Sequence, residues 1–277
     1  MKHSMKIENW KLKILPRKSL GQNFLINPHI VDKIINAGDI SKSDLVLEIG
    51  PGTGNLTKEL AKKARGVVAI EKDARLTEYL REQTIMNNAQ WEKVEIIEED
   101  ILKFNPANCP LLTDGYKIIA NIPYNITSNL LRIIFEKWPR PELIVLLIQK
   151  EVAKRIMAKP PHMNLLALSV QYYSDPEIVG YISKNNFRPV PKVDSAIIRL
   201  TPKFIIHDTK YIIQLFNLIH IGFSEKRKQL ASLLAKKIKI DKDRVGEMLQ
   251  EIGLSPTARA ENLSLEEWKA LARTLFS

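Results

Sequence analysis

Hydrophobic positions along the first two thirds of the chain alternate between two patterns. Short apolar runs typical of buried strands occur at residues 45–49, 67–70, 94–97, 117–120 and 143–148. Amphipathic stretches with helical spacing lie around them, at residues 28–37, 56–63, 74–81 and 128–137. This alternation of strand and helix predicts an α/β fold with a parallel sheet and helices on both faces.

Two more strands are predicted later in the chain, at residues 177–182 and 194–200. They are joined by a proline-rich loop, Phe187 to Lys192, and no helical stretch separates them. Parallel neighbours need a long crossover, so we expect these strands to form an antiparallel hairpin at one edge of the sheet.

Beyond residue 205 the pattern becomes helical throughout. Helices are predicted at residues 211–219, 226–237, 243–251 and 265–275, and Ser264 with Glu267 forms a capping box before the last. The expected organisation is therefore a basic N-terminal arm (1–18), a sheet domain (19–202) and a small all-α C-terminal domain (203–277).

The composition of the chain favours one kind of partner and argues against disulfides and metal sites. The net charge of +11 favours a polyanionic partner such as nucleic acid. Residues 1–18 are then either a frayed terminus or an arm that contacts phosphates. The single cysteine, Cys109, excludes an intrachain disulfide, and the five histidines lack ligand-like spacing, so no metal is expected. The low cysteine count also makes a reducing, cytoplasmic setting the expectation. The longest apolar run, 143–148, is too short to span a membrane. We expect a monomer.

A glycine-rich turn follows the first predicted strand, with the sequence Glu48-Ile49-Gly50-Pro51-Gly52-Thr53-Gly54. Glu71, Asp100 and Asn121 end the next three strands, so all should meet at one edge of the sheet. The spacing differs from the G-x-G-x-x-G of dinucleotide-binding dehydrogenases. It suits a nucleoside without a pyrophosphate, whose ribose and adenine the acids can bind. The alternative is a tight turn with solvated acids.

Asn121-Ile122-Pro123-Tyr124 carries the predicted chemistry. The Asn121 side-chain oxygen and a main-chain carbonyl of Ile122 or Pro123 can accept hydrogen bonds from an aromatic amine, and acceptors placed for a more tetrahedral nitrogen stabilise the transition state. Pro123 fixes the backbone, and Tyr124 can stack on the base. The alternative is a strand that ends in a proline turn with a buried tyrosine.

This tetrapeptide resembles the motif of rRNA adenine dimethyltransferases, and three other segments resemble the same family: Leu20 to Leu25, Phe187 to Ser195 and Phe223 to Leu230. The resemblance implies a Rossmann-like sheet that binds S-adenosyl-L-methionine. It implies that Asn23 and Leu25 contact this cofactor, that Phe187 is a second aromatic beside the target base, and that the third segment is a basic helix start that contacts RNA. The implied sets are as follows: for the cofactor, Asn23, Leu25, Gly50, Gly52, Glu71, Asp100 and Asn121; for catalysis, Asn121, Pro123, Tyr124 and Phe187.

Within that family the chain looks most similar to the branch that modifies two adjacent adenines near the 3′ end of 16S rRNA, during small-subunit biogenesis. The large-subunit (23S) branch linked to macrolide resistance remains an alternative, as does a non-catalytic RNA-binding assembly factor. Two features depart from the family pattern. Glu99 replaces a glycine before Asp100, and residues 160–166 lack the glycine, tyrosine and arginine often found there.

Overall fold

The structure is a computed structural model that describes residues 14–86, 91–205, 208–225 and 227–276. Most of the predicted basic arm, residues 1–13, lies outside the described residues. Contacts divide the chain into two compact units. The sheet unit runs to Ala153 and includes Pro176–Pro202, and the helical unit contains Lys154–Asp175 with Lys203–Ser277. The sequence-based division kept residues 154–175 with the sheet, whereas their contacts are with the C-terminal helices.

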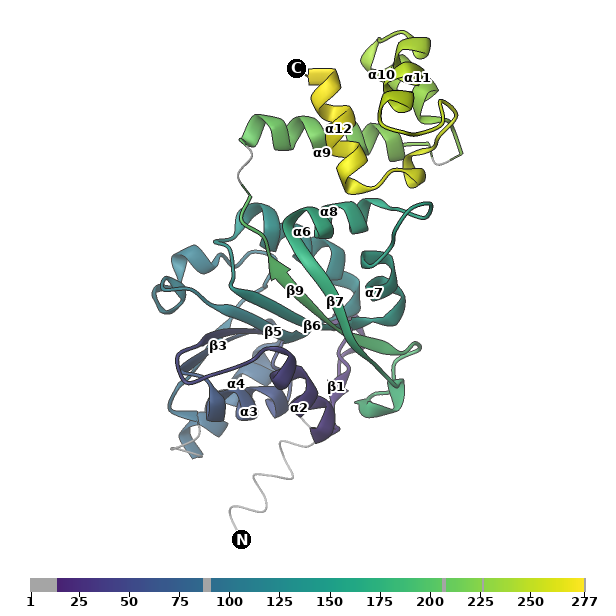
Figure 1. Ribbon diagram of the computed structural model, residues 1–277. Coiled ribbons are helices and arrows are strands. Elements are labelled where there is room, and N and C mark those ends of the chain that lie inside the picture. The colour runs from purple at the N-terminus through teal and green to yellow at the C-terminus, as the bar shows by residue number, and fades with distance from the viewer. Residues whose placement is uncertain (1–13, 87–90, 206–207, 226, 277) are drawn as a thin grey trace. The chain divides into compact units, whose positions relative to one another are not determined.

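A seven-stranded sheet forms the centre of the sheet unit, in the order β4-β3-β2-β5-β6-β9-β7 (Figure 1). The first five strands in this order are parallel, in register pairs such as Glu48 with Ala69 and Asn121 with Leu147. Except for the edge strand β4, which contains Glu95 and Glu98, each is a mainly apolar run, as expected for strands covered on both faces. Their bounds are β2 Leu45–Ile49, β3 Gly66–Glu71, β4 Val94–Glu98, β5 Lys117–Asn121 and β6 Leu143–Gln149.

The predicted edge hairpin is present. Strand β9 (Ser195–Pro202) pairs antiparallel with β6, and β7 (Ser174–Ile182) lies beside β9 at the edge. Burial along β7 alternates, because successive side chains point to opposite faces of the sheet and one of these faces is more exposed. The sheet therefore ends in an antiparallel segment, β9 and β7, as expected for two strands without a crossover helix between them.

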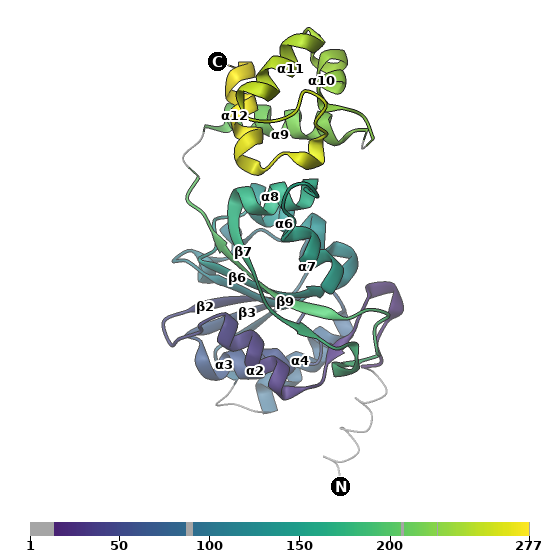
Figure 2. The same cartoon turned by 45° about the vertical axis from the view of Figure 1, so that its right-hand side comes forward.

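Helices cover both faces of this sheet, as the alternating pattern predicted. In both views α2 (Pro28–Ala37), α3 (Asn55–Lys63) and α4 (Ala74–Met86) lie on one face, and α6 (Thr127–Lys137) lies on the other (Figures 1 and 2). Helix α2 begins where predicted, since the Asn27 side chain accepts a hydrogen bond from His29 N and Pro28 occupies the first turn.

A second, two-stranded sheet was not predicted. Strand β1 (Phe24–Leu25) pairs antiparallel with β8 (Phe187–Arg188), which joins two segments far apart in the chain. A strand of two residues is too short to show an alternation of apolar and polar positions, so it is recognised only by the strand with which it pairs. The pairing holds the segment before α2 against the proline-rich loop.

The helical unit contains α8 (Leu165–Tyr173), α9 (Thr209–Phe223), α10 (Leu230–Ile238), α11 (Lys242–Glu251) and α12 (Leu265–Phe276). They enclose one core around the fully buried Trp268. The predicted capping box of α12 is confirmed, with Ser264 N donating to Glu267 and Glu267 N donating to Ser264 Oγ. Helix α10 begins at Leu230, later than predicted, and the basic residues Arg227 and Lys228 before it lie outside any helix.

Among the described residues, no helix is long and apolar enough to cross a membrane. Those residues also contain no group of three or more histidine, cysteine or acidic side chains that could hold a metal ion.

Candidate active site

One cavity opens at the carboxyl ends of β2, β3 and β5, the edge where parallel α/β sheets bind ligands. It contains about 1210 Å³ of empty space, the open solvent at its mouth included. All of the predicted site residues except Phe187 line it: Asn23, Leu25, Gly50, Gly52, Glu71, Asp100, Asn121, Pro123 and Tyr124. The strand ends thus bring the glycine turn, the acids and the asparagine motif into one site.

The glycine turn donates a hydrogen bond to the carboxylate of Glu71, which lines the cavity. Gly50 and Gly52 have φ values of +66° and +60°, which side-chain-bearing residues rarely adopt. Gly52 N donates to one carboxylate oxygen of Glu71 at 3.2 Å, and Asp73 N donates to the other at 2.9 Å. Burial raises the pKa of Glu71, against the effect of these donors. Each oxygen keeps a lone pair for a further donor, such as a sugar hydroxyl.

Glu48 is a buried acid in the cavity wall, and one of its carboxyl oxygens has no partner in the described part of the chain. It is 1% exposed, and its Oε2 has no hydrogen-bond partner among the described residues. Burial raises its pKa from the ordinary 4.5 to about 8, and the nearby Glu71 adds to the shift. An unsatisfied buried carboxyl of this kind favours a ligand that brings a donor or a positive charge.

Asp100 lies in the cavity wall as an ion pair. Lys72 Nζ donates to its Oδ2 at 2.7 Å, and Leu102 N donates to Oδ1 at 3.1 Å. Lys72 holds the pKa of Asp100 below its ordinary value. Glu99, the departure from the family pattern, lines the same wall. The acids of the lining outnumber its one lysine, so the cavity suits a cationic nucleoside better than a pyrophosphate.

Asn121 ends β5 with its carboxamide held in one orientation. Its Nδ2 donates to the main-chain oxygen of Asn23 at 3.1 Å. A carbonyl can only accept, so the nitrogen must face Asn23 and the oxygen remains as the acceptor. The two main-chain carbonyls that could bind a substrate amine differ in their contacts. The Pro123 carbonyl already accepts a hydrogen bond from Ile126 N at 3.3 Å. Of the two predicted carbonyls, this leaves that of Ile122 for a substrate amine.

Tyr124 is tethered at its hydroxyl end. Its OH and Ser195 Oγ are 2.6 Å apart, and Ser195 is fully buried at the start of β9. Burial raises the pKa of Tyr124, as does the charge of Asp194. The tether fixes the direction of the ring while the ring lines the cavity.

Phe187 lies elsewhere. Its side chain is fully buried and belongs to the core that includes Leu25, Val31 and Ile197. It does not line the cavity. In this arrangement its ring supports β1, through the pairing of Phe187 with Leu25, and is not presented to a base. Its predicted stacking role therefore has no support from the geometry.

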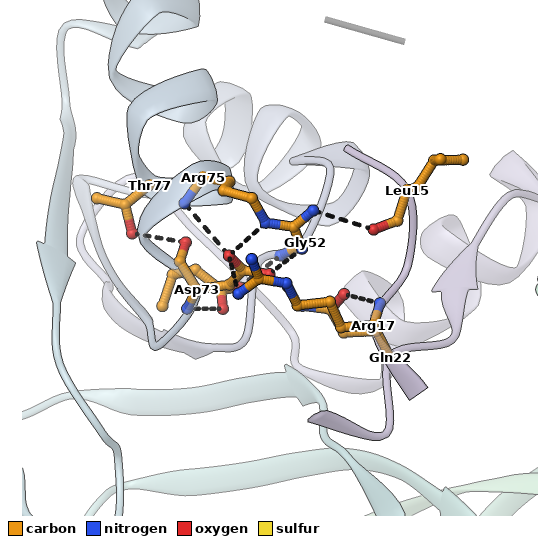
Figure 3. A network of polar contacts seen from close by, with 8 residues as sticks. Leu15, Arg17, Gln22, Gly52, Asp73, Arg75 and Thr77 are labelled. Carbon is orange, nitrogen blue, oxygen red and sulfur yellow. Dashed lines mark hydrogen bonds and ion pairs between the residues drawn. The ribbon is translucent and has the colours of Figure 1, made fainter. Parts of the chain in front are cut away.

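A polar network beside the cavity was missed by the sequence analysis (Figure 3). Its centre is the buried Asp73, which accepts from Gln22 Nε2 at 3.0 Å and from Arg75 Nε at 3.0 Å. Arg17 lies 3.6 Å from the same carboxylate. Gln22 lies inside a segment singled out for its resemblance, but no local pattern pairs it with a residue 51 positions away.

The fold and this site define a methyltransferase-type α/β domain, in which a parallel sheet with an antiparallel edge holds its ligand at the glycine turn. The model of the ribosomal RNA adenine dimethylase family matches residues 15–276. The chain belongs to this family.

Curated relatives and solved structures agree with that assignment. A ribosomal RNA small subunit methyltransferase A of Dehalococcoides mccartyi is 41% identical, over 92% of this chain and 87% of its own. Another, of Crocosphaera subtropica, is 40% identical over 93% and 97%. The crystal structure of a dimethyladenosine transferase from Plasmodium falciparum has a TM-score of 0.73 and 29% identity, covering 90% of this chain and 95% of its own. That of the 23S rRNA methyltransferase ErmE has 0.75 and 27%, covering 92% and 100%.

Proposed function

We propose that this protein transfers methyl groups from S-adenosyl-L-methionine to the N6 amines of two adjacent adenines near the 3′ end of small-subunit rRNA. The observation that carries the proposal is the Asn121 carboxamide, whose nitrogen is bound to Asn23 and whose oxygen is left as an acceptor in an acid-lined cavity. The small-subunit assignment rests on the relatives named above.

The residues of the cavity fit this cofactor. Glu71, with two oxygens already aligned by backbone donors, suits the ribose hydroxyls, and Asp100 suits the adenine amine once Lys72 moves aside. The unpartnered Glu48 oxygen suits the positively charged end of the ligand. When bound, S-adenosyl-L-methionine supplies an electrophilic methyl group on its sulfonium.

The chain's own residues then act on the adenine. Asn121 Oδ1 and the Ile122 carbonyl accept hydrogen bonds from the amine, which favours a tetrahedral nitrogen whose lone pair points away from the ring. Tyr124, held by Ser195, stacks on the base and aligns it. No side chain has to remove a proton before attack, because the nitrogen becomes acidic only after it is methylated.

The base has to reach this site unpaired or flipped out of a helix. We expect recognition to rest mainly on RNA shape and phosphates, which suits the net charge of +11. Exposed basic residues of the segment before α10, such as Lys228, are candidates for phosphate contacts, as is the N-terminal arm. Binding should then weaken steeply as salt concentration rises.

A second candidate is methylation of large-subunit rRNA, favoured by the structural likeness to the 23S rRNA methyltransferase ErmE. The experiment that separates the two incubates purified protein and methyl-labelled S-adenosyl-L-methionine with unmethylated small and large subunits in parallel. Label in small-subunit RNA supports the proposal. Label confined to large-subunit RNA supports the second candidate.

A further inference from the structure

The segment from Arg17 to Leu25 contributes Ser19–Leu25 to the cavity lining and contacts several elements that carry site residues; we call it the strap. Its Phe24 ring packs over Gly52, where an added Cβ would lie 3.0 Å from the ring. The Asn23 carbonyl receives Asn121 Nδ2, and the Leu25 carbonyl receives Asn55 Nδ2 at 2.8 Å. The strap therefore covers the glycine turn and orients the catalytic amide at the same time.

One contact holds the strap to the acid-bearing strand end. Gln22 Nε2 donates to Asp73 Oδ2 at 3.0 Å, while Gln22 Oε1 accepts from Arg17 N at 2.7 Å. Gln22 thus folds the strap on itself and fastens it to Asp73. Arg75 adds a further link, since its guanidinium binds Asp73 and also donates to the Leu15 carbonyl at 3.4 Å (Figure 3).

Asp73 is charged and fixed at this point. Burial alone would raise its pKa, but the hydrogen bonds of Arg75 and Gln22 outweigh burial and keep the pKa below its ordinary value. Asp73 N also donates to Glu71. The chain of contacts therefore runs from Glu71 through Asp73 and Gln22 along the strap to Asn121.

We propose that Gln22 and Asp73 form a latch that closes the strap over the cavity, and that both are positioning residues for methyl transfer although the catalytic amide is Asn121. This inference rests on the proposed function and extends it to two residues outside the chemistry. A closed latch retains the cofactor through Phe24 and Leu25. It also keeps the Asn121 oxygen aimed at the substrate through the Asn23 carbonyl.

The test reverses the polarity of the latch. Gln22→Glu places a second carboxylate against Asp73 without changing the size of the side chain, so the strap should open. Asp73→Asn alone removes the charge that binds Arg17 and Arg75. The double variant Q22E/D73N restores an amide–carboxylate pair with donor and acceptor exchanged. Lys33→Gln changes the net charge by the same amount as Q22E, on an exposed residue of α2 outside both the strap and the cavity lining, and is the matched control.

Two readouts are taken on each protein: the equilibrium dissociation constant for S-adenosyl-L-methionine alone, and kcat for methyl transfer to unmethylated small subunits. We expect Q22E to weaken cofactor binding and lower kcat by roughly tenfold or more each, the scale of losing a hydrogen bond to a buried charge. Thermal unfolding should stay close to wild type. The double variant should recover at least half of each loss on a logarithmic scale, and K33Q should change neither.

A Q22E protein that binds and turns over like wild type would overturn the latch, as would a double variant no better than the worse single variant. Failure of the proposed function looks different. In that case wild type transfers no methyl to either subunit, while the cofactor-binding readout still reports on the latch.

Discussion

The side-chain nitrogen of Asn121 donates a hydrogen bond to the main-chain oxygen of Asn23, 3.1 Å away. These residues lie 98 positions apart and belong to two motifs, one at the end of β5 and one in the strap. The contact decides which end of the carboxamide faces the substrate. The orientation of the proposed catalytic amide therefore depends on the strap being in place.

The tether between Tyr124 and Ser195 should matter for turnover more than for cofactor binding. Tyr124→Phe keeps the ring but removes the hydroxyl, and Ser195→Ala removes its partner. Each should lower kcat roughly three- to tenfold, the scale of one hydrogen bond. The double variant should be no worse than the poorer single variant, since both changes break one contact. Additive losses in kcat would show that the hydroxyls act separately.

Phe187 provides a test of core support against base stacking. Phe187→Ala should destabilise the fold by about 3–5 kcal/mol, since it empties a fully buried aromatic site. Phe187→Leu keeps most of the volume and should cost less than about 1.5 kcal/mol. Because the ring does not line the cavity, we expect the leucine variant to keep kcat within about threefold of wild type. A stable leucine variant with a large loss of kcat would instead assign the ring a stacking role.

Glu48 should make stability fall as pH rises. Its pKa is raised from 4.5 to about 8 in the folded chain, so between these values the folded state keeps a proton that the unfolded state has released. The stabilising effect is complete below pH 4.5 and is lost as pH rises through 8. Glu48→Gln removes this dependence. Denaturant unfolding should show its stability relative to wild type increasing over that window, by roughly 2–5 kcal/mol in total.

A stability difference between Glu48→Gln and wild type that does not depend on pH would contradict the raised pKa of Glu48. A stability difference that stays constant between pH 5 and pH 8 would mean that Glu48 is ionised in the folded chain at neutral pH. The raised pKa and the unpartnered oxygen would then not describe the free protein.

The helical unit offers a matched pair of glycines. A Cβ at Gly222 in α9 would overlap the Trp268 ring, whereas a Cβ at Gly246 in α11 would meet only Pro256 at 3.4 Å. Gly222→Ala should therefore destabilise the protein by about 1–3 kcal/mol. Gly246→Ala should stabilise it by about 0.5–1 kcal/mol through helix propensity. Thermal unfolding of the two variants measures both effects, and a stable Gly222→Ala protein would contradict the packing around Trp268.

Most of the sheet could be predicted because its strands are continuous apolar runs. Strands β2, β5 and β6 match the expected positions within a residue, since burial on both faces requires such runs. Their parallel order then brought Glu71, Asp100 and Asn121 to one edge without further information. The site was predictable to the extent that it is built from strand ends.

What the sequence did not predict depends on contacts between distant segments. The two-residue strands β1 and β8, the Gln22–Asp73 contact and the Tyr124–Ser195 tether have no local signature, because the sequence around each partner does not point to the other. Phe187 shows the same limit. Its motif suggested a place beside the base, but its burial depends on how β8 packs against β1.

The most direct test of the central claim compares the methylated nucleosides formed by wild type with those formed by Asn121→Ala. Unmethylated small subunits are incubated with S-adenosyl-L-methionine and with wild type, Asn121→Ala or Asn129→Ala, an exposed asparagine on α6 that serves as the control. Nucleosides near the 3′ end of the RNA are then analysed by mass spectrometry. The account predicts N6,N6-dimethyladenosine at two adjacent adenines with wild type and the control. It predicts a loss of orders of magnitude with Asn121→Ala, which still folds and binds the cofactor. Dimethyladenosine formed by Asn121→Ala at a comparable rate, or none formed by wild type that binds the cofactor, would contradict it.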